Sequence, residues 1–425
     1  TVNVNTISQA NTGGDGLIPI IYGNRVYNVF HHLAAGTKWL MCLDMLTGAS
    51  CAGVSYPTYV GATAGTAFGS GTNNIQFSTA NNHYLDSATG RLYLPASRAP
   101  SDGGVLCIDL ANSKSCGFTK LATISFYNQN IHTMGGAFYN GRFYVSANTQ
   151  MMCFDVSTQS PCVGQPYSNG LTTIAFKVSE MGGKIITTAY NPAAPQLSCF
   201  DPATNARCAG WPTTAVNAVM PTGIGVYGEL LPFPMLDTTG IATGVCYSII
   251  DGNAVQNTKI ECRSLANGSV VTTPAGLISS MPSAKHMLGH FGWTTLGTKM
   301  YLPVNSPAYS PAADYIACFD WATNQPCGAP YPKVLVNTST NSWPYGIVSD
   351  PARPACLWTL GDKGYLINFN ANDGSSPCNN STGATLSNVA PANAFCAAGT
   401  NAVTGWDKVE ITGVTAGSGF TSAYA

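Results

Sequence analysis

Ten of the fifteen cysteines form five pairs in which the two cysteines stand nine positions apart. Zinc sites favour cysteines with roughly two to four residues between them, and redox sites favour a Cys-x-x-Cys arrangement, so this spacing suits neither. It does suit a hairpin in which two cysteines face each other, because opposed Cα atoms about 4.5–5.5 Å apart match disulfide geometry. The spacing therefore predicts five disulfides and an oxidising compartment. The predicted pairs are Cys42–Cys51, Cys107–Cys116, Cys153–Cys162, Cys199–Cys208 and Cys318–Cys327.

The cysteine pairs belong to a longer repeat. Each first cysteine lies in a short apolar stretch that ends in aspartate, as in residues 152–155 (Met-Cys-Phe-Asp), and a glycine turn with an aromatic strand precedes most of them, as in residues 141–144 (Gly-Arg-Phe-Tyr). Two degenerate copies surround Cys262 and Asn368. Four short strands per unit, seven times over, predict an all-β fold: a seven-bladed β-propeller with a disulfide-bridged hairpin in most blades. The repeat anchors are residues 42, 107, 153, 199, 262, 318 and 368.

The aspartate after each anchor strand has two interpretations. Repeated carboxylates could bind a ligand, but a residue that recurs in every unit is more typical of a structural role. An aspartate directly after a strand can accept hydrogen bonds from the backbone N–H groups of the following turn. We therefore expect turn residues at Asp44, Asp109, Asp155, Asp201 and Asp320.

Five cysteines fall outside the regular pairs. Cys246 and Cys262 lie on strands expected to be neighbours in the fifth blade, which favours a cross-strand bridge. Cys378 stands at the second-cysteine position of the seventh blade, where the usual partner position holds Asn368. We expect a Cys378–Cys396 bridge that ties the tail to the last blade and leaves Cys356 free.

The repeat also sets the domain organisation. Residues 1–385 are predicted to form the propeller, and residues 386–425 a β-rich or irregular tail that closes the ring, covers a face or begins a further domain. Segments 61–80, 213–243 and 269–285 lengthen the connections between strands, and long connections usually build the binding surfaces of a propeller. Sequons for N-glycosylation begin at Asn267, Asn337, Asn379 and Asn380, a number that chance also explains in a chain so rich in Asn, Ser and Thr.

The unit resembles the repeat of pyrroloquinoline-quinone-type propellers, in which a Gly-x-Val-Tyr-Val strand precedes a Leu-Tyr-Ala-Leu-Asp-x-x-Thr-Gly strand and turn. The nearest match is residues 24–30 followed by residues 39–48, and the resemblance spans roughly residues 20–380. It implies the propeller fold and an extracytoplasmic setting. The chain departs from the quinone-dependent dehydrogenases of that family, which usually have eight units. Cysteine pairs replace their closing tryptophans, and the chain has neither a vicinal cysteine pair nor a Cys-x-x-Cys-His motif. The resemblance thus implies no dehydrogenase activity, and we predict no cofactor.

Charge and the length of the apolar runs each exclude one class of partner. Only 9 % of residues are charged, 18 basic against 19 acidic, so no basic patch is expected to bind nucleic acid. No apolar run reaches the roughly 18–20 residues that cross a bilayer as a helix, so no membrane span is predicted. The surface is expected to be hydrated by hydroxyl and amide groups.

Histidine is scarce, and four imidazoles have related positions. His83, His132 and His290 each precede the glycine turn of their blade by seven to nine residues, and His286 lies four residues before His290. This places them near the start of the innermost strand, at the mouth of the central channel. They could converge on a metal or an anionic ligand. The favoured alternative is that they bond channel waters or neighbouring backbone, and no metal site is predicted. His31 and His32 end a strand of the first blade and are expected to face a loop.

These observations predict a non-enzymatic extracellular or cell-surface propeller, with the periplasm as an alternative compartment. Its expected role is binding, adhesion or surface assembly into a filament or layer, with a glycan, a protein or further copies of itself as the partner. The alternative is a secreted hydrolase or oxidoreductase with its site at the channel mouth. No Gly-x-Ser-x-Gly or His-Glu-x-x-His motif supports that alternative.

Overall fold

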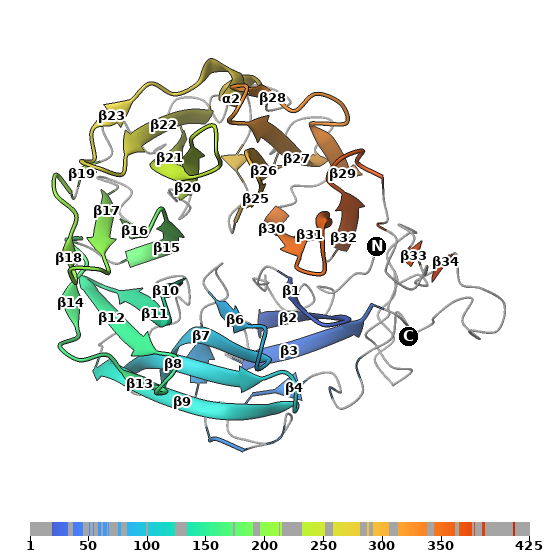
Figure 1. Ribbon diagram of the computed structural model, residues 1–425. Helices are drawn as coiled ribbons and strands as arrows, with labels where there is room; N and C mark the ends of the chain where they lie inside the picture. The colour runs from blue at the N-terminus through green and yellow to red at the C-terminus, as the bar shows by residue number, and fades with distance from the viewer. Residues whose placement is uncertain are drawn as a thin grey trace.

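The chain folds into a seven-bladed β-propeller (Figure 1). A computed structural model describes residues 19–32, 37–45, 51, 54, 58–60, 63–65, 67, 75–77, 83–98, 101–123, 134–172, 175–189, 196–211, 213–214, 232–250, 258–280, 287–288, 292–305, 313–337, 344–361, 365–375, 378, 385–386 and 411–412. Each blade is a small antiparallel sheet made of consecutive strands, with its first strand nearest the centre of the ring.

The first four blades contain the strands up to β19. Blade 1 has β1 (Ile20–Tyr22), β2 (Arg25–His32), β3 (Thr37–Asp44) and β4 (Thr58–Tyr59). Blade 2 has β5 (Ile75–Phe77), β6 (Tyr84–Asp86), β7 (Arg91–Arg98), β8 (Asp102–Asp109) and β9 (Lys114–Thr123). Blade 3 has β10 (Met134–Tyr139), β11 (Arg142–Ala147), β12 (Gln150–Asp155), β13 (Ser160–Pro161) and β14 (Tyr167–Ser168). Blade 4 has β15 (Ala175–Met181), β16 (Lys184–Ala189), β17 (Gln196–Asp201), β18 (Ala206–Arg207) and β19 (Thr213–Thr214).

The remaining strands complete the ring. Blade 5 has β20 (Pro232–Leu236), β21 (Ala242–Ile250), β22 (Thr258–Ser264) and β23 (Val270–Val271). Blade 6 has β24 (Met287–Leu288), β25 (Thr294–Leu296), β26 (Lys299–Asn305), β27 (Ala313–Asp320), β28 (Gln325–Pro326) and β29 (Lys333–Asn337). Blade 7 has β30 (Pro344–Asp350), β31 (Arg353–Gly361) and β32 (Tyr365–Asn370). In the tail, β33 (Thr385–Leu386) pairs with β34 (Ile411–Thr412). The division of the chain at residue 385 stays a prediction.

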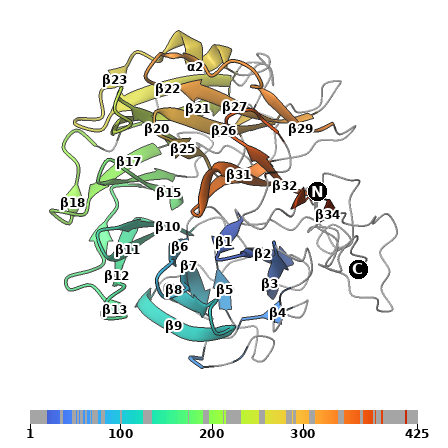
Figure 2. The ribbon, with the colours of Figure 1, turned by 45° about the vertical axis from the view of Figure 1, so that its right-hand side comes forward.

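A short helix, α2 (Ala275–Ser279), follows blade 5 and lies on the outer rim beside β28 of blade 6 (Figures 1 and 2). Its Leu277 side chain packs into the apolar cluster between blades 5 and 6. None of the helices among the described residues is long and apolar enough to cross a membrane.

Apolar clusters between neighbouring blades form the core. Between blades 1 and 2, for example, Tyr27 and Leu40 pack with Leu92 and Ile108. The repeated tyrosine lies directly opposite the anchor cysteine in several blades, as Tyr144 does opposite Cys153. Its hydroxyl can reach the next blade: Tyr27 donates a hydrogen bond to the carbonyl of Leu110 at 3.3 Å. The repeated aromatic and cysteine positions are therefore contacts between blades.

The five regular cysteine pairs are at disulfide distance, with Cα atoms 5.0–5.4 Å apart. In blade 3 the N–H of Cys162 also donates to the carbonyl of Cys153 at 2.9 Å, which continues the β12–β13 pairing by one step. The hairpin predicted from the spacing is thus present. Cys246 and Cys262 are directly opposed on β21 and β22, with Cα atoms 4.0 Å apart, so the predicted cross-strand bridge is present as well.

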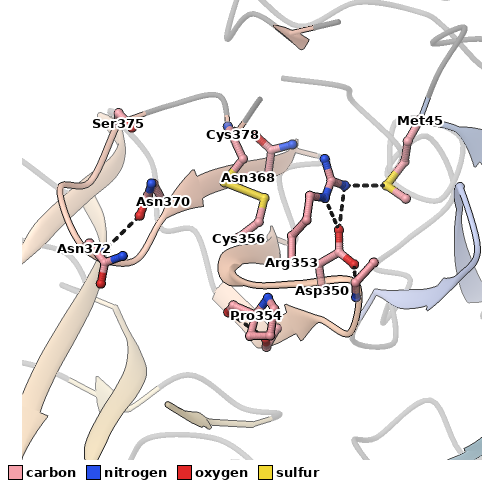
Figure 3. Close-up of a disulfide and its surroundings, with 12 residues drawn as sticks. Met45, Asp350, Arg353, Pro354, Cys356, Asn368, Asn370, Asn372, Ser375 and Cys378 are labelled. Carbon is pink, nitrogen blue, oxygen red and sulfur yellow. Dashed lines mark hydrogen bonds and ion pairs between the residues drawn. A yellow bond between two sulfur atoms is a disulfide. The ribbon is translucent and has the colours of Figure 1, made fainter. Parts of the chain in front are cut away.

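The predicted Cys378–Cys396 bridge is wrong, because Cys378 pairs with Cys356 instead (Figure 3). The N–H of Cys378 donates to Oδ1 of Asn368 at 2.9 Å, so Asn368 holds Cys378 beside β32 as a cysteine carbonyl does in other blades. Cys356 lies on the neighbouring strand β31, and its Cα is 5.8 Å from that of Cys378. Cys356 is therefore not free, and Cys396 lies outside the described residues.

Candidate functional site

The two faces of the ring are built differently. In blade 3, Tyr139 pairs with Arg142 and Asp155 with Ser160 at one end of the strands, whereas Ala147 pairs with Gln150 at the other end. We call the first end, where strand 1 turns into strand 2 and strand 3 into strand 4, the turn face. The opposite end, where strand 2 leads to strand 3 and blade leads to blade, is the connection face.

Short regular turns make the turn face. Asn140 and Gly141, with φ of 47° and 78°, join β10 to β11, as expected for a two-residue hairpin loop. Asp155 accepts hydrogen bonds from the N–H groups of Ser157 at 2.9 Å and Thr158 at 3.1 Å. The Ser157 hydroxyl and these N–H groups lower the pKa of Asp155 below its usual value.

The turn role predicted for the repeated aspartates is confirmed where the following turn is described. Asp109, Asp201 and Asp320 each accept from a backbone N–H two or three residues later at 2.9–3.0 Å. In the degenerate blades Ser264 and Asn370 do the same, at 3.2 and 2.9 Å. The turn after Asp44 lies outside the described residues. These side chains therefore stabilise the turns of the turn face by accepting their backbone N–H groups.

His83 lies directly before β6, on the innermost strand of blade 2. Its Nδ1 is enclosed and has no hydrogen-bond partner among the residues that the structure describes, although the residue as a whole is only partly buried. Burial lowers the pKa of His83 to about 4, so the imidazole is neutral at pH 7. A neutral ring with one free nitrogen can accept or donate one hydrogen bond, or bind one metal ion.

The described stretches of the innermost strand change register beside His83. Phe77 pairs with Ala96 and Tyr84 with Tyr93, so more residues separate the two on the innermost strand than separate their partners, between which only Leu94 and Pro95 lie. Blade 6 shows the same kind of register change: Leu288 pairs with Val304 and Thr294 with Tyr301, across Leu302 and Pro303 of β26. Each register change thus lies opposite a proline, which has no N–H to offer a neighbouring strand.

Strand register shows that the residue of blade 6 equivalent to His83 is Trp293 and not His290, although His83 and His290 both precede a glycine turn by seven residues. The turn before β7 spans residues 87–90, whereas Gly297 and Thr298 alone separate β25 from β26. Opposite Tyr301, Thr294 therefore takes the place of Tyr84, and Trp293 that of His83. Trp293 donates its Nε1–H to the carbonyl of Pro232 at 3.0 Å, whereas Nδ1 of His83 has no partner in the described part of the chain.

His132, His286 and His290 lie outside the described residues, so their convergence on one ligand stays a prediction. His31 and His32 are the last residues of β2, as predicted, and reach the connection face. Within the described part of the chain, no three His, Cys, Asp or Glu side chains are grouped as metal ligands.

A small charged cluster lies at the connection face of blade 2. Asp102 begins β8 and forms ion pairs with Arg98 at 2.8 Å and with Lys120 at 2.6 Å. Arg98 also lies over the ring of Phe118, 5.2 Å from its centroid. Hydrogen bonds from Lys120 and Arg98 lower the pKa of Asp102. The cluster presents two cations against one carboxylate, and sequence reasoning missed it because its members come from three strands.

A buried polar group lies in blade 5. Arg263 donates from Nε to the hydroxyl of Tyr247 at 2.9 Å and pairs through Nη2 with Glu261 at 2.6 Å. Its Nη1 donates to the carbonyl of Gly268 at 3.0 Å. Burial raises the pKa of Tyr247 above its usual value. The guanidinium is fully engaged on all three nitrogens, so this network stabilises the blade and its outer turn.

No protein-family model matches the chain. No curated protein matches it either. Among solved structures, a prolyl endopeptidase is similar at 12 % identity with a TM-score of 0.46, over 91 % of this chain and 52 % of the other, so the chain spans about half of that enzyme. The WD40 domain of Neurospora crassa Pan2 is similar at 9 % identity with a TM-score of 0.42, over 69 % of this chain and 76 % of the other. Both similarities concern the fold alone.

Proposed function

We propose that this chain is a non-enzymatic extracellular propeller that acts in binding, adhesion or surface assembly through its connection face. Its partner is a glycan, a protein or further copies of the chain itself. The observation that carries the proposal is the difference between the two faces: the turn face consists of short turns held by their own side chains, as at Asp155. The described strands before and after residues 124–133 and 215–231 end and begin at the connection face, whereas Gly65 and Ala67 of the segment between blades 1 and 2 lie beside the start of β9. Segments that connect the elements of a rigid scaffold are where binding surfaces are usually built.

The disulfides support the extracellular part of the proposal. Every blade contains one bridge, and each bridge joins two residues of the same blade. Structural disulfides persist in oxidising compartments and are rare in the cytosol. Protein from its native source should therefore contain oxidised cysteines when thiols are blocked before lysis.

A matched pair of variants tests which face binds. Lys120 on the connection face and Lys184 on the turn face each form a 2.6 Å ion pair with an aspartate, and both are partly exposed. Binding partners come first from a glycan array and a pull-down, and self-association from size-exclusion chromatography with electron microscopy. Lys120→Ala should then weaken binding or self-association by about three- to tenfold, as expected for a charge at the rim of an interface. Lys184→Ala should leave it unchanged. Loss on Lys184→Ala with no effect of Lys120→Ala would overturn the assignment of the face.

The enclosed imidazole of His83 favours one second candidate, a secreted hydrolase or oxidoreductase with its site near the centre of the ring. A neutral imidazole with a free nitrogen is a common general base. A broad hydrolase and dehydrogenase panel tests this candidate. Turnover by the wild type that disappears in a folded His83→Ala variant would replace the binding proposal with an enzymatic one.

A further inference from the structure

The turn between β22 and β23 contains the sequon Asn267-Gly268-Ser269 on the turn face of blade 5. Asn267 and Ser269 are both exposed. Oδ1 of Asn267 accepts the N–H of Ser269 at 3.1 Å, so the side chain folds towards the third residue of the sequon. No described residue accepts a hydrogen bond from its Nδ2, which leaves this nitrogen available to solvent.

The backbone of this turn is firmly held, although its asparagine side chain is exposed. Ser264 donates its N–H to the carbonyl of Ser269 and accepts the N–H of Gly268, both at 2.9 Å. Arg263 holds the Gly268 carbonyl at 3.0 Å. The Asn267 carbonyl packs against Gly210 of blade 4, where a Cβ atom would clash with it. The backbone of the turn is thus fixed by these contacts, while the Asn267 side chain stays exposed.

An exposed apolar side chain follows the sequon directly. Val270 begins β23 and is 57 % exposed. The N–H of Leu265 donates to the carbonyl of Thr243 at 3.1 Å, which joins this turn to the turn before β21. A bulky hydrophilic group on Asn267, three positions before Val270, could shield the Val270 side chain from water.

We infer that Asn267 is an attachment site for an asparagine-linked glycan on the turn face of blade 5. The inference rests on the extracellular part of the proposed function, because such transfer takes place outside the cytosol. The other three sequons carry no comparable argument: Asn337 ends β29 and the two residues that follow it lie outside the described part, as do Asn379 and Asn380. A glycan on the turn face leaves the connection face free for its partner.

The transfer needs a donor of defined chemical class, an oligosaccharide attached through its anomeric carbon to a polyisoprenoid phosphate or diphosphate. Nδ2 of Asn267 forms a bond to the anomeric carbon, and the bond from that carbon to the phosphate oxygen breaks. The lipid phosphate leaves with the bonding electron pair, and a base on the transferase takes one amide proton. No oxidation or reduction occurs.

The test is site-specific mass spectrometry on the full chain secreted from a eukaryotic cell line that performs N-glycosylation. Enzymatic release of N-glycans in ¹⁸O-labelled water should convert Asn267 to labelled aspartate. Asn267→Gln and Ser269→Ala should both abolish the label, and Ser269→Thr should retain it. If Asn267→Gln is not secreted, comparison of Ser269→Ala with Ser269→Thr still shows whether Asn267 is glycosylated.

A secreted, disulfide-bonded chain whose Asn267 peptide carries no label would overturn the inference. The proposed function fails separately, through cysteines that are reduced in protein taken from its native source. The disulfide state of each sample, measured by alkylation before reduction, therefore distinguishes the two failures.

Discussion

At the scale of a single residue, His83 makes the stability of the fold depend on pH. Its imidazole is enclosed, and burial lowers its pKa from 6.5 to about 4. Between these two values the unfolded chain binds a proton that the folded chain excludes. Stability therefore rises with pH across this window and is lost as pH falls from about 6.5 towards 4. The turn aspartates titrate at lower pH, because hydrogen bonds lower the pKa of residues such as Asp155.

Replacement of His83 by glutamine should remove this pH dependence. We expect the wild type to lose about 2–3 kcal/mol of unfolding free energy from His83 between about pH 7 and pH 4.5, as its lowered pKa requires. His83→Gln should lose only what other groups contribute. Urea denaturation of both proteins, with disulfides intact, measures the difference. Parallel stability curves for the two proteins across this range would show that His83 is not enclosed.

Cysteine pairing makes a second prediction at the residue scale. The seven disulfides use every cysteine except Cys396. A chain denatured without reductant should therefore react with one equivalent of a thiol reagent, and Cys396→Ser should react with none. Peptide mapping should place the label on Cys396. A labelled Cys356 would contradict the Cys356–Cys378 bridge, and an unreactive monomer would contradict the pairing as a whole.

The hairpin turn after the third strand is the most regular element of the fold. In blade 3, one carboxylate oxygen of Asp155 accepts the N–H groups of Ser157 and Thr158. Asp155→Ala removes the acceptor of both and should destabilise the protein by about 1 kcal/mol, as loss of a cap does at a helix start. Asp155→Asn keeps an acceptor oxygen and should cost less. Thermal unfolding of the two variants measures the order, and equal losses would assign the effect to charge instead of hydrogen bonding.

Features that depend on a few neighbouring residues could be predicted from the sequence. They are the cysteine hairpins, the glycine turns and the aspartate turns, and their repetition gives the number of blades. Features that depend on contacts between strands of a blade could not be predicted. The predicted insertion 213–243 contains β20, the innermost strand of blade 5, whose prolines obscured its pattern. The register changes of the innermost strand opposite Pro95 and Pro303 coincide with a shared Tyr-Leu-Pro sequence that could have indicated them.

The same limit applies to the candidate site. His83 was selected by its spacing from Gly90, but its position depends on the longer turn before β7, which spacing alone does not reveal. Arg98, Asp102 and Lys120 gather only when β7, β8 and β9 pair. Cys356 meets Cys378 because Asn368 holds the chain beside β32. Each of these depends on register, which is a property of the folded sheet.

At the scale of the whole molecule, the covalent links lie within blades and the contacts between blades are non-covalent. Apolar clusters fill the spaces between neighbours, and a few hydrogen bonds cross them, such as Tyr331 to the Ala371 carbonyl at 2.7 Å. No described disulfide joins blade 7 to blade 1, and Arg353 of blade 7 contacts Met45 of blade 1 through Nη2 and Sδ at 3.9 Å (Figure 3). The described apolar clusters join each blade to the next from blade 1 to blade 7, and between blade 7 and blade 1 the Arg353–Met45 contact is a described link.

Arg353 is the residue through which this junction can be weakened selectively. It pairs with Asp350, which is 1 % exposed, through Nε at 2.8 Å and Nη2 at 2.5 Å. Arg353→Ala leaves a buried carboxylate without its cation and should cost roughly 3 kcal/mol. Lys184→Ala breaks the more exposed pair with Asp201 and should cost less than about 1 kcal/mol. Hydrogen exchange should accelerate in β1–β3 and β30–β32 of the Arg353 variant more than in β15–β17 across the ring. Uniform acceleration would instead mean that the seven blades open as one cooperative unit.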